Sequence, residues 1–256
     1  MQVELLALDE QQAELAALLA NCDQADWVQP SRCDGWTVAD VVLHLAQTNE
    51  LATASAAGRF TDGANELGRG VDRASSIDDA ADRAVARDRH LTTAEVWRRW
   101  ESSVHSLRDA LGACEPDRRV EWVAGTLSAR TLATTRLAET WIHTGDVADA
   151  LGGEPGGDES NGGDRLRLIA RLAWRTLPYA FALHGQELAG PVAFELDGPG
   201  GEQWTFEPDG PAVTRISGDA LDLCLVAARR LHPSATSLCS VGPDGPAVLE
   251  LVRTYA

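Results

Sequence analysis

The segment "GGEPGGDESNGGD", residues 152–164, constrains the fold of this chain more than any other stretch. It contains six glycines, one proline and four acidic residues. A chain of this composition has almost no side chains to bury, so it behaves as a linker and not as part of a core. We therefore expect two domains, 1–152 and 164–256, joined by a linker over 153–163.

The overall composition is that of an acidic globular protein. Hydrophobic residues make up 44% of the 256 residues, which is enough for a core, and the net charge is −17. That charge disfavours nucleic acid and anionic membranes as partners. No apolar run of about 18 residues is present, and the N-terminus lacks the pattern of a signal peptide. We expect a cytoplasmic monomer or homodimer.

The basic and sulfur-containing residues exclude several kinds of chemistry. All 22 basic residues are arginine, so a lysine Schiff base and a lysine-dependent phosphate loop are excluded. The absence of lysine and the richness in Ala, Arg, Gly and Asp are typical of a very GC-rich genome. Five scattered cysteines without a CxxC pair indicate free thiols in a reducing compartment.

The first domain reads as a helical bundle. Apolar residues at helical spacing predict long helices over 2–21, 38–57, 92–113 and 128–151. Thr37 with Asp40 has the spacing of a capping box, and Thr92 or Thr93 caps the third helix. Between these helices we expect a loop over 58–76, an exposed polar helix over 76–90 and a short link over 114–126. Four long helices with such connections predict a bundle.

The second domain reads as α+β. We expect a helix over 164–185 interrupted near Pro178, two strands within 190–210, and a third strand over 212–217. Helices are expected over 218–232 and 247–256, partly covering the sheet.

The stretch "ETWIHTGDVADALG", residues 139–152, places polar groups where the fourth helix should be apolar. Glu139, His143 and Asp146 follow at i, i+4 and i+7, in line with Leu132 and Ala150. A carboxylate in a bundle core needs compensation, and a divalent cation supplies it because carboxylate oxygen and imidazole nitrogen both ligate Zn²⁺. The alternative is an ordinary surface pair, since ExxxH alone is a weak motif.

A third ligand must come from another helix. His44 lies on the second helix and His105 on the third, and periodicity does not select between them. A lone histidine at either place is more often structural than a ligand.

Two motifs together resemble the mycothiol-dependent maleylpyruvate isomerase family, which belongs to the DinB-like and YfiT-like metal-binding bundles. "SRCDGWTVADVVLHLA" has a turn, then Gly-Trp-Thr, then a helix with a histidine seven residues after the threonine. "ETWIHTGDVADALG" resembles the second motif of the family. The segments "VAFELDGPGGEQWTFEPDG" and "ISGDALDLCLVAARR" are similar to an actinobacterial subfamily with a sterol-carrier-protein-like C-terminal domain.

The resemblance implies a fold, a site and a chemistry. It implies an N-terminal DinB-like four-helix bundle with a smaller α+β C-terminal domain, and His44, Glu139 and His143 as ligands of a divalent metal, Zn²⁺ first. Mycothiol would be the cosubstrate and a small unsaturated electrophile the substrate. Asp146 would orient a ligating histidine, or else pair with an arginine. Residues 58–92 depart from a minimal isomerase, so maleylpyruvate itself is not implied.

Other residues near the motifs have two readings each. Trp36 and Trp141 belong to the core or wall a pocket. Arg229 and Arg230 bind an anionic cofactor or substrate, or lie on the surface. Cys33 is expected to be an inert thiol.

Three functions fit these expectations. The first is a thiol-dependent isomerase or S-transferase that uses the metal to deprotonate mycothiol. The others are a hydrolase that uses a metal-bound hydroxide, and a metal-binding or small-molecule-binding protein without turnover.

Overall fold

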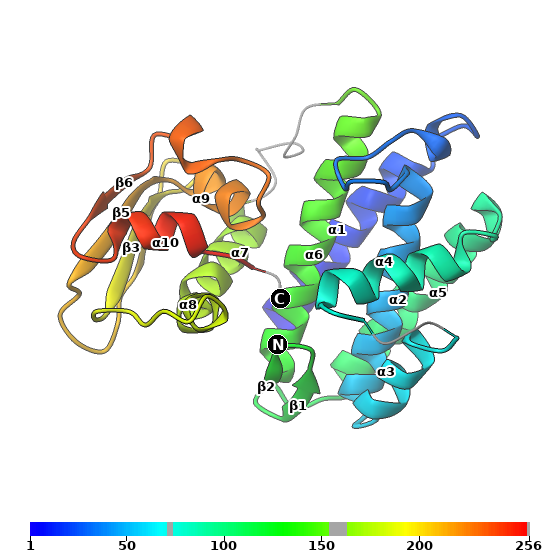
Figure 1. The fold of residues 1–256 in the computed structure, drawn as a ribbon, viewed down its shortest axis with the longest axis horizontal. Helices are drawn as coiled ribbons and strands as arrows, with labels where there is room; N and C mark the ends of the chain where they lie inside the picture. The colour runs from blue at the N-terminus through cyan, green and yellow to red at the C-terminus, as the bar shows by residue number, and fades with distance from the viewer. Residues whose placement is uncertain (71–73, 154–162, 255–256) are drawn as a thin grey trace. The chain divides into compact units, whose positions relative to one another are not determined.

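The computed structural model describes residues 1–70, 74–153 and 163–254. The chain divides into two compact units, Met1–Gly157 and Asp158–Tyr255 (Figure 1). Of the linker expected over 153–163, residues 154–162 lie outside the described part of the chain.

The first unit is built on the four predicted long helices: α1 (Gln2–Leu19), α2 (Val38–Ala56), α5 (Thr93–Gly112) and α6 (Ala129–Ala150). Helix α2 packs against α5 and α6, and α1 packs against α6 (Figure 1). The predicted capping box begins α2, because the Thr37 hydroxyl accepts from the Asp40 amide and the Asp40 carboxylate accepts from the Thr37 amide. Thr92 and Glu95 make the same arrangement at α5.

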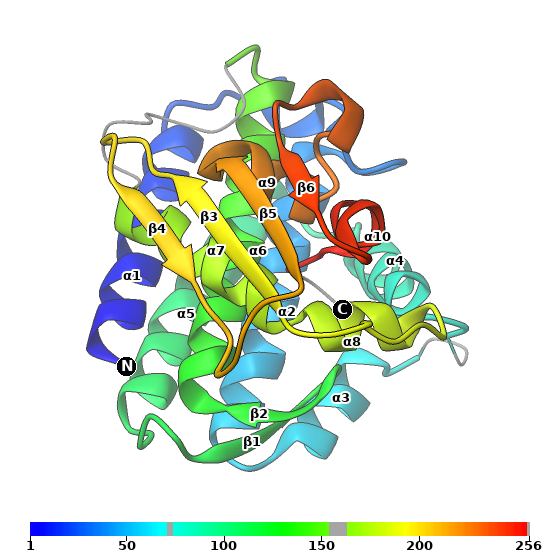
Figure 2. The same cartoon turned by 90° about the vertical axis from the view of Figure 1, so that its left-hand side faces the viewer.

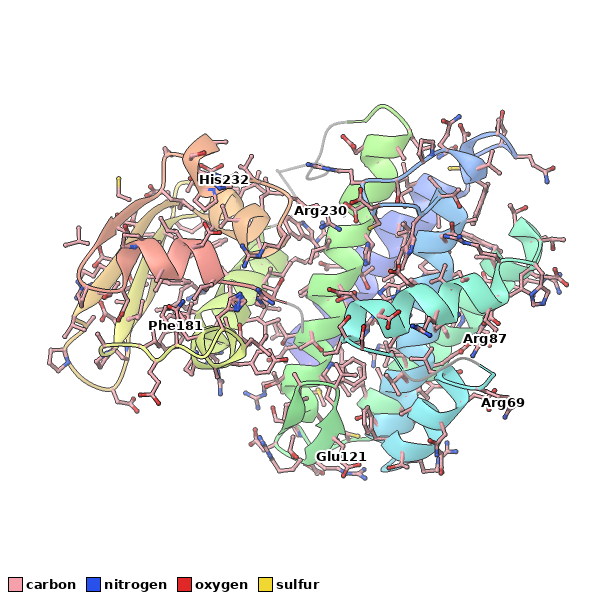
Figure 3. The ribbon with its side chains drawn as sticks, in the orientation of Figure 1. Arg69, Arg87, Glu121, Phe181, Arg230 and His232 are labelled. Atoms are coloured by element: carbon pink, nitrogen blue, oxygen red, sulfur yellow. The ribbon has the colours of Figure 1, made fainter. Side chains whose placement is uncertain are left out.

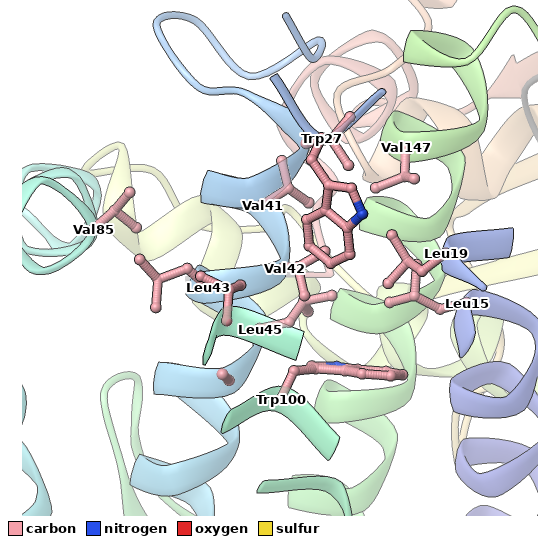
Figure 4. Packing of buried hydrophobic residues seen from close by; sticks show 13 residues of the cluster. Leu15, Leu19, Trp27, Val41, Val42, Leu43, Leu45, Val85, Trp100 and Val147 are labelled. Carbon is pink, nitrogen blue, oxygen red and sulfur yellow. The ribbon is translucent and has the colours of Figure 1, made fainter. Parts of the chain in front are cut away.

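An apolar core holds these helices together at the end of the bundle that contains the start of α2. Trp27, from the short 3₁₀ helix η1 (Asp26–Val28), packs among Val42, Leu19 and Val147 from three long helices (Figure 4). Trp100 of α5 lies in the same cluster and is 3% exposed. Interiors of this kind are close-packed, so α2 and α6 are held at a defined separation.

The prediction of a loop over 58–76 is wrong, because helix α3 (Phe60–Leu67) forms within this segment. Gly63, which reads as a loop residue, is what allows α3 to pack on α2. A Cβ at this position would lie 2.7 Å from the Ala54 Cβ and 3.2 Å from the Leu51 Cδ1. Glycine therefore permits a close approach of two helices here. Residues 71–73 lie outside the described part.

Two further expectations for the connections need correction. Helix α4 (Ile77–Asp88) is not simply exposed, since Val85 is fully buried and the Ala84 carbonyl accepts from Gln47 of α2. The expected link over 114–126 contains a hairpin of β1 (Arg119–Trp122) and β2 (Gly125–Ser128). Each strand has four residues, too few to show an alternating pattern in the sequence.

The second unit has the predicted α+β architecture. Its sheet has the order β4-β3-β5-β6, with β3 and β5 parallel and the outer pairs antiparallel (Figure 2). The strands are β3 (Val192–Asp197), β4 (Gln203–Phe206), β5 (Thr214–Asp219) and β6 (Cys239–Val241). Strand β6 was not predicted, because three residues carry no periodic signal.

Helices cover one face of this sheet. Helix α7 (Gly163–Arg175) packs on β3 and β4, and α9 (Ala220–Ala227) packs on β5 (Figure 2). Phe194 is paired with Phe206 on one side and Ile216 on the other, which makes a buried row across three strands. The other helices in the described part of this unit are α8 (Leu177–Leu183), the 3₁₀ helix η3 (Pro233–Ala235) and α10 (Gly245–Leu251).

The interruption expected near Pro178 is a change of helix. Helix α7 ends at Arg175, and α8 begins with Pro178 in its first turn. Proline suits that position because its missing amide hydrogen would have no partner there. Among the described residues, no helix combines the length and the apolar character needed to cross a bilayer.

Candidate metal centre

Three predicted ligand residues meet in the interior of the bundle. Glu139 and His143 lie one turn apart on α6, and His44 faces them from α2. His44 is 8% and His143 6% exposed. An i, i+4 pair projects from one face of a helix, and the packing of α2 against α6 brings the third side chain to the same point. We call His44, Glu139, His143 and Asp146 the α2–α6 cluster.

The ligand atoms of this cluster converge. Glu139 Oε1 lies 3.1 Å from His44 Nε2 and 3.4 Å from His143 Nε2. One ligand atom from each of the three residues lies within 4.8 Å of the other two. Two imidazole nitrogens and one carboxylate oxygen are a donor set that suits Zn²⁺ and its neighbours and leaves further coordination positions open. The residues therefore fit a divalent metal.

Asp146 contacts the other side of the His143 ring. Its Oδ2 lies 2.9 Å from His143 Nδ1, and the residue is 1% exposed. With Nδ1 donating its proton to Asp146, Nε2 is left to face Glu139 and His44. This contact matches the first of the two readings of Asp146 from the sequence.

Burial and hydrogen bonding act in opposite directions on these groups. Burial by itself raises the pKa of Glu139, yet hydrogen bonds from His143 and His44 outweigh it and hold that pKa well below its usual value. Burial lowers the pKa of His143, but its hydrogen bonds, first of all with Asp146, raise that pKa well above the ordinary value. For His44 burial prevails, and its pKa is lowered. The hydrogen bonds therefore favour the charged forms of Glu139 and His143, whereas burial favours the neutral form of His44.

Cys33 is a neighbour of the cluster that the sequence did not place there. Its Sγ lies 3.5 Å from Asp146 Oδ2 and 3.9 Å from His143 Nδ1. The turn that carries it is closed by Ser31 and Trp36, whose backbone groups bond at 2.8 Å, with Gly35 at φ +75°. The sequence contained a signal for this position of Cys33, because the turn directly precedes the helix that carries His44.

Three further candidate residues from the sequence, His105, Trp36 and Trp141, are not ligands in the cluster. His105 is exposed, and its Nδ1 lies 2.8 Å from the Glu101 carbonyl on its own helix, so it is not part of the cluster. The Trp36 ring lies 5.0 Å from the ring of His44, and Trp36 also packs against the apolar core around Trp27. Trp141 is half-buried.

Arg229 and Arg230 belong to the second unit, whereas the α2–α6 cluster belongs to the first. They follow α9, and Figure 3 shows Arg230 with His232 in this segment. Arg229 has a positive φ of 59° and donates to the Glu250 carbonyl at 2.6 Å. Arg230 donates to the Ala228 carbonyl at 3.1 Å. Both side chains are half-buried.

The fold and the cluster together define a class: a helical-bundle protein with a candidate three-ligand metal centre between two helices, joined to an α+β domain. Comparison with known families agrees with this architecture. The model of the mycothiol maleylpyruvate isomerase N-terminal domain matches residues 8–148, and the chain belongs to this family.

Full-length relatives extend the similarity over both units. The uncharacterised proteins Rv0036c and MT0041 of two Mycobacterium tuberculosis strains, H37Rv and CDC 1551, are each 32% identical over 244 residues, covering 95% of this chain and 91% of the relative. A crystal structure of the mycothiol-dependent maleylpyruvate isomerase has a TM-score of 0.60 at 20% identity, with 95% of both chains covered. A histidine-to-alanine mutant of that enzyme gives 0.59 at 19%. These structures show that the fold is shared.

Proposed function

We propose that this protein is a metal-dependent isomerase or S-transferase that uses mycothiol and acts on a small, unsaturated, electrophilic substrate. The observation that carries the proposal is the convergence of His44, Glu139 and His143 in the core of a bundle from this family. Two buried imidazoles and a half-buried carboxylate in one group are costly unless a ligand compensates for them.

The chain's own residues would hold the metal and set its ligands. Nε2 of His44, Oε1 of Glu139 and Nε2 of His143 are the donors, and Asp146 keeps the His143 ring in the orientation that presents Nε2. Zn²⁺ suits this donor set best. A divalent ion there supplies the positive charge that favours a thiolate over a thiol at neutral pH.

The reaction then follows from thiol chemistry. The thiolate sulfur adds to an electrophilic carbon of the double bond, and the electron pair of that bond moves to the conjugated acceptor of the substrate. Rotation about the new single bond and expulsion of the thiolate give the isomer. Protonation of the adduct instead gives the S-transferase product. The burial of His44, His143 and Asp146 and the Trp36 ring beside His44 would limit the access of bulk water that competes with the thiol.

The second unit would act on the ligands and not on the metal. We propose that residues 164–256 form a sterol-carrier-protein-like domain. Arg229 and Arg230 are its candidates for contact with an anionic cosubstrate or a substrate carboxylate, because guanidinium groups bind carboxylates well. This part of the proposal is supported by the resemblance of the sequence alone.

The first experiment measures bound metal. Purified protein should contain about one divalent ion per chain by mass spectrometry, His143→Ala should contain none, and His105→Ala should match the wild type. His105 is the matched control because it is a helical histidine of the same unit outside the cluster. A wild-type protein that binds no Zn²⁺ contradicts the proposal.

The second experiment separates the thiol from the metal. Metal-loaded protein should show heat of binding with mycothiol and should consume cis-unsaturated acids, including maleylpyruvate, only when mycothiol is present. A protein that binds Zn²⁺ but not mycothiol would be a metal-binding protein of another kind, and the thiol-dependent mechanism would be abandoned.

A further inference from the structure

Arg136 is a fully buried arginine on the helix that carries two of the proposed ligands. It lies on α6 one turn before Glu139 and two turns before His143, so the three side chains share one face of the helix. Arg136 is 2% exposed and heads the largest fully buried side chains among the described residues. No motif in the sequence marks this residue.

The guanidinium of Arg136 connects α6 to α2 about one helical turn from the cluster. Its Nη2 donates to Thr48 Oγ1 at 2.8 Å, and its Nε donates to Asn49 Oδ1 at 3.3 Å, both on α2. Thr48 in turn donates to the His44 carbonyl at 2.9 Å, so Arg136 lies one helical turn from His44 on α2 as well as from Glu139 on α6.

These partners are neutral, which is unusual for a buried charge. Within the described residues, no carboxylate oxygen lies within the 4.0 Å of an ion pair with Arg136. The carboxylate that interacts with it electrostatically is that of Glu139. Burying a cation without an ion pair is costly, because the ion loses its hydration and gains no opposite charge in return. The cost of burying this charge has to be offset by an interaction with another charged group nearby.

The net charge of the proposed metal site indicates which group the charge of Arg136 would stabilise. A divalent ion with Glu139, Asp146 and two neutral imidazoles carries no net charge, and a neutral fourth ligand would complete it. Arg136 adds one positive charge in a water-poor interior, where charges interact strongly. One monoanion entering the site restores neutrality.

We infer that Arg136 is a positioning residue that makes the centre select a monoanionic ligand, such as a thiolate or a carboxylate, over a neutral one. The inference rests on the proposed metal site. It predicts that the charge of Arg136 strengthens binding of the anion and weakens binding of the bare metal ion, because like charges repel.

The test uses Co²⁺-loaded protein, whose visible spectrum reports the ligands of the metal. Thiocyanate serves as the anionic probe and imidazole as the neutral probe. Arg136→Gln removes the charge and keeps an amide that can donate to Thr48, whereas Arg136→Lys keeps the charge and serves as the matched control. In Arg136→Gln we expect the Kd for thiocyanate to rise about tenfold and the Kd for imidazole to change less than about twofold.

The affinity for Co²⁺ itself separates charge from structure. Arg136→Gln should bind Co²⁺ as well as the wild type or several-fold more tightly, whereas loss of a purely structural contact would weaken metal and both probes together. If Arg136→Gln does not fold, Arg136→Met takes its place, because an apolar side chain of similar size can replace a buried charge.

Each outcome decides. An unchanged ratio of the two probe affinities in Arg136→Gln, or an Arg136→Lys variant that behaves like Arg136→Gln, overturns the inference while the proposed function stands. A wild-type protein that takes up no Co²⁺ or Zn²⁺ overturns the proposed function and this inference with it.

Discussion

Two polar clusters of the first unit differ in how their charges are compensated. In the cluster around Asp88, the carboxylate accepts hydrogen bonds from Arg87 at 2.7 Å, Arg99 at 2.8 Å and Gln47 at 3.0 Å. Arg99 also pairs with Glu50 at 2.8 Å. Figure 3 shows Arg87 on α4, which carries this carboxylate. These donors, Arg87 first, hold the pKa of Asp88 well below its usual range.

The α2–α6 cluster is compensated differently. Glu139 lies between two histidines and is in ion-pair contact with no arginine among the described residues. Imidazole can give up its proton and present a lone pair, whereas guanidinium cannot. Burial of charge alone therefore does not mark a site. The Asp88 cluster is complete with the chain's own permanent charges, while the α2–α6 cluster has exchangeable groups aimed at one point.

The largest expected effect tests this difference directly. Glu139→Gln keeps the shape of the side chain but removes its charge, so Zn²⁺ affinity should fall by more than the roughly 100-fold typical of losing an outer partner of a ligand. Glu50→Gln, the same change in the Asp88 cluster, should leave the affinity unchanged. Competition with a chromophoric chelator measures both. Equal losses in the two variants would end the distinction.

Asp88→Ala should act on stability and not on metal. Removing this carboxylate takes away the carboxylate partner of Arg87 and leaves Arg99 with Glu50 alone. We expect the free energy of unfolding to fall by about 3 kcal/mol. Urea denaturation of the metal-free protein measures it, and the Zn²⁺ content of the folded variant should stay at the wild-type level. Loss of Zn²⁺ from a folded Asp88→Ala protein would show that the clusters are coupled.

Asp146→Asn should weaken the centre without abolishing it. The amide can still accept from His143 Nδ1 but no longer raises the basicity of the ring, so Zn²⁺ affinity should fall about 10- to 100-fold. Isothermal titration calorimetry checks this. An unchanged affinity would favour the other reading of Asp146, in which it pairs elsewhere.

Acidification should weaken metal binding in a defined direction. Because the pKa of His143 is raised above its usual value, the protonated ring competes with the metal until the pH exceeds that pKa. Zn²⁺ affinity should therefore rise with pH by up to about tenfold per unit while one proton is displaced. Titrations in buffers of different ionisation enthalpy measure the released proton.

The metal-free protein should show the opposite trend. A group whose pKa is higher in the folded than in the unfolded state stabilises the fold below the unfolded value, and this contribution is lost as pH rises through the folded pKa. His143 is such a group. Thermal melts at increasing pH measure this stability. If the metal-free protein becomes more stable as the pH rises through the pKa of folded His143, the raised pKa of His143 is contradicted.

Cys33→Ala should have the smallest effect. Its thiol is only a weak donor to Asp146, so Zn²⁺ affinity should change by less than about threefold. A large loss would place Cys33 among the residues that define the centre and would contradict its interpretation as an inert thiol.

The errors in predicting the fold concern short elements. Gly63 was interpreted as a loop signal, although it permits contact between α3 and α2. Strands β1, β2 and β6 have three or four residues each, so their hydrogen bonds to neighbouring strands define them and no pattern does. The long helices and their caps were predicted because both depend on residues within a few positions of each other.

The same division of local from long-range information applies to the site. The sequence alone determined that Glu139, His143 and Asp146 share one helical face, because the geometry of the α-helix sets the positions of residues three, four and seven apart. Periodicity left His44 and His105 open, and the resemblance of "SRCDGWTVADVVLHLA" to a known family selected His44. The tertiary structure places His44 beside Glu139 and His105 on the surface, and only it brought Cys33 and Arg136 to the cluster. Their positions depend on how α2, its preceding turn and α6 pack against one another, and contacts between residues about 90 to 110 positions apart leave no periodic trace in a single sequence.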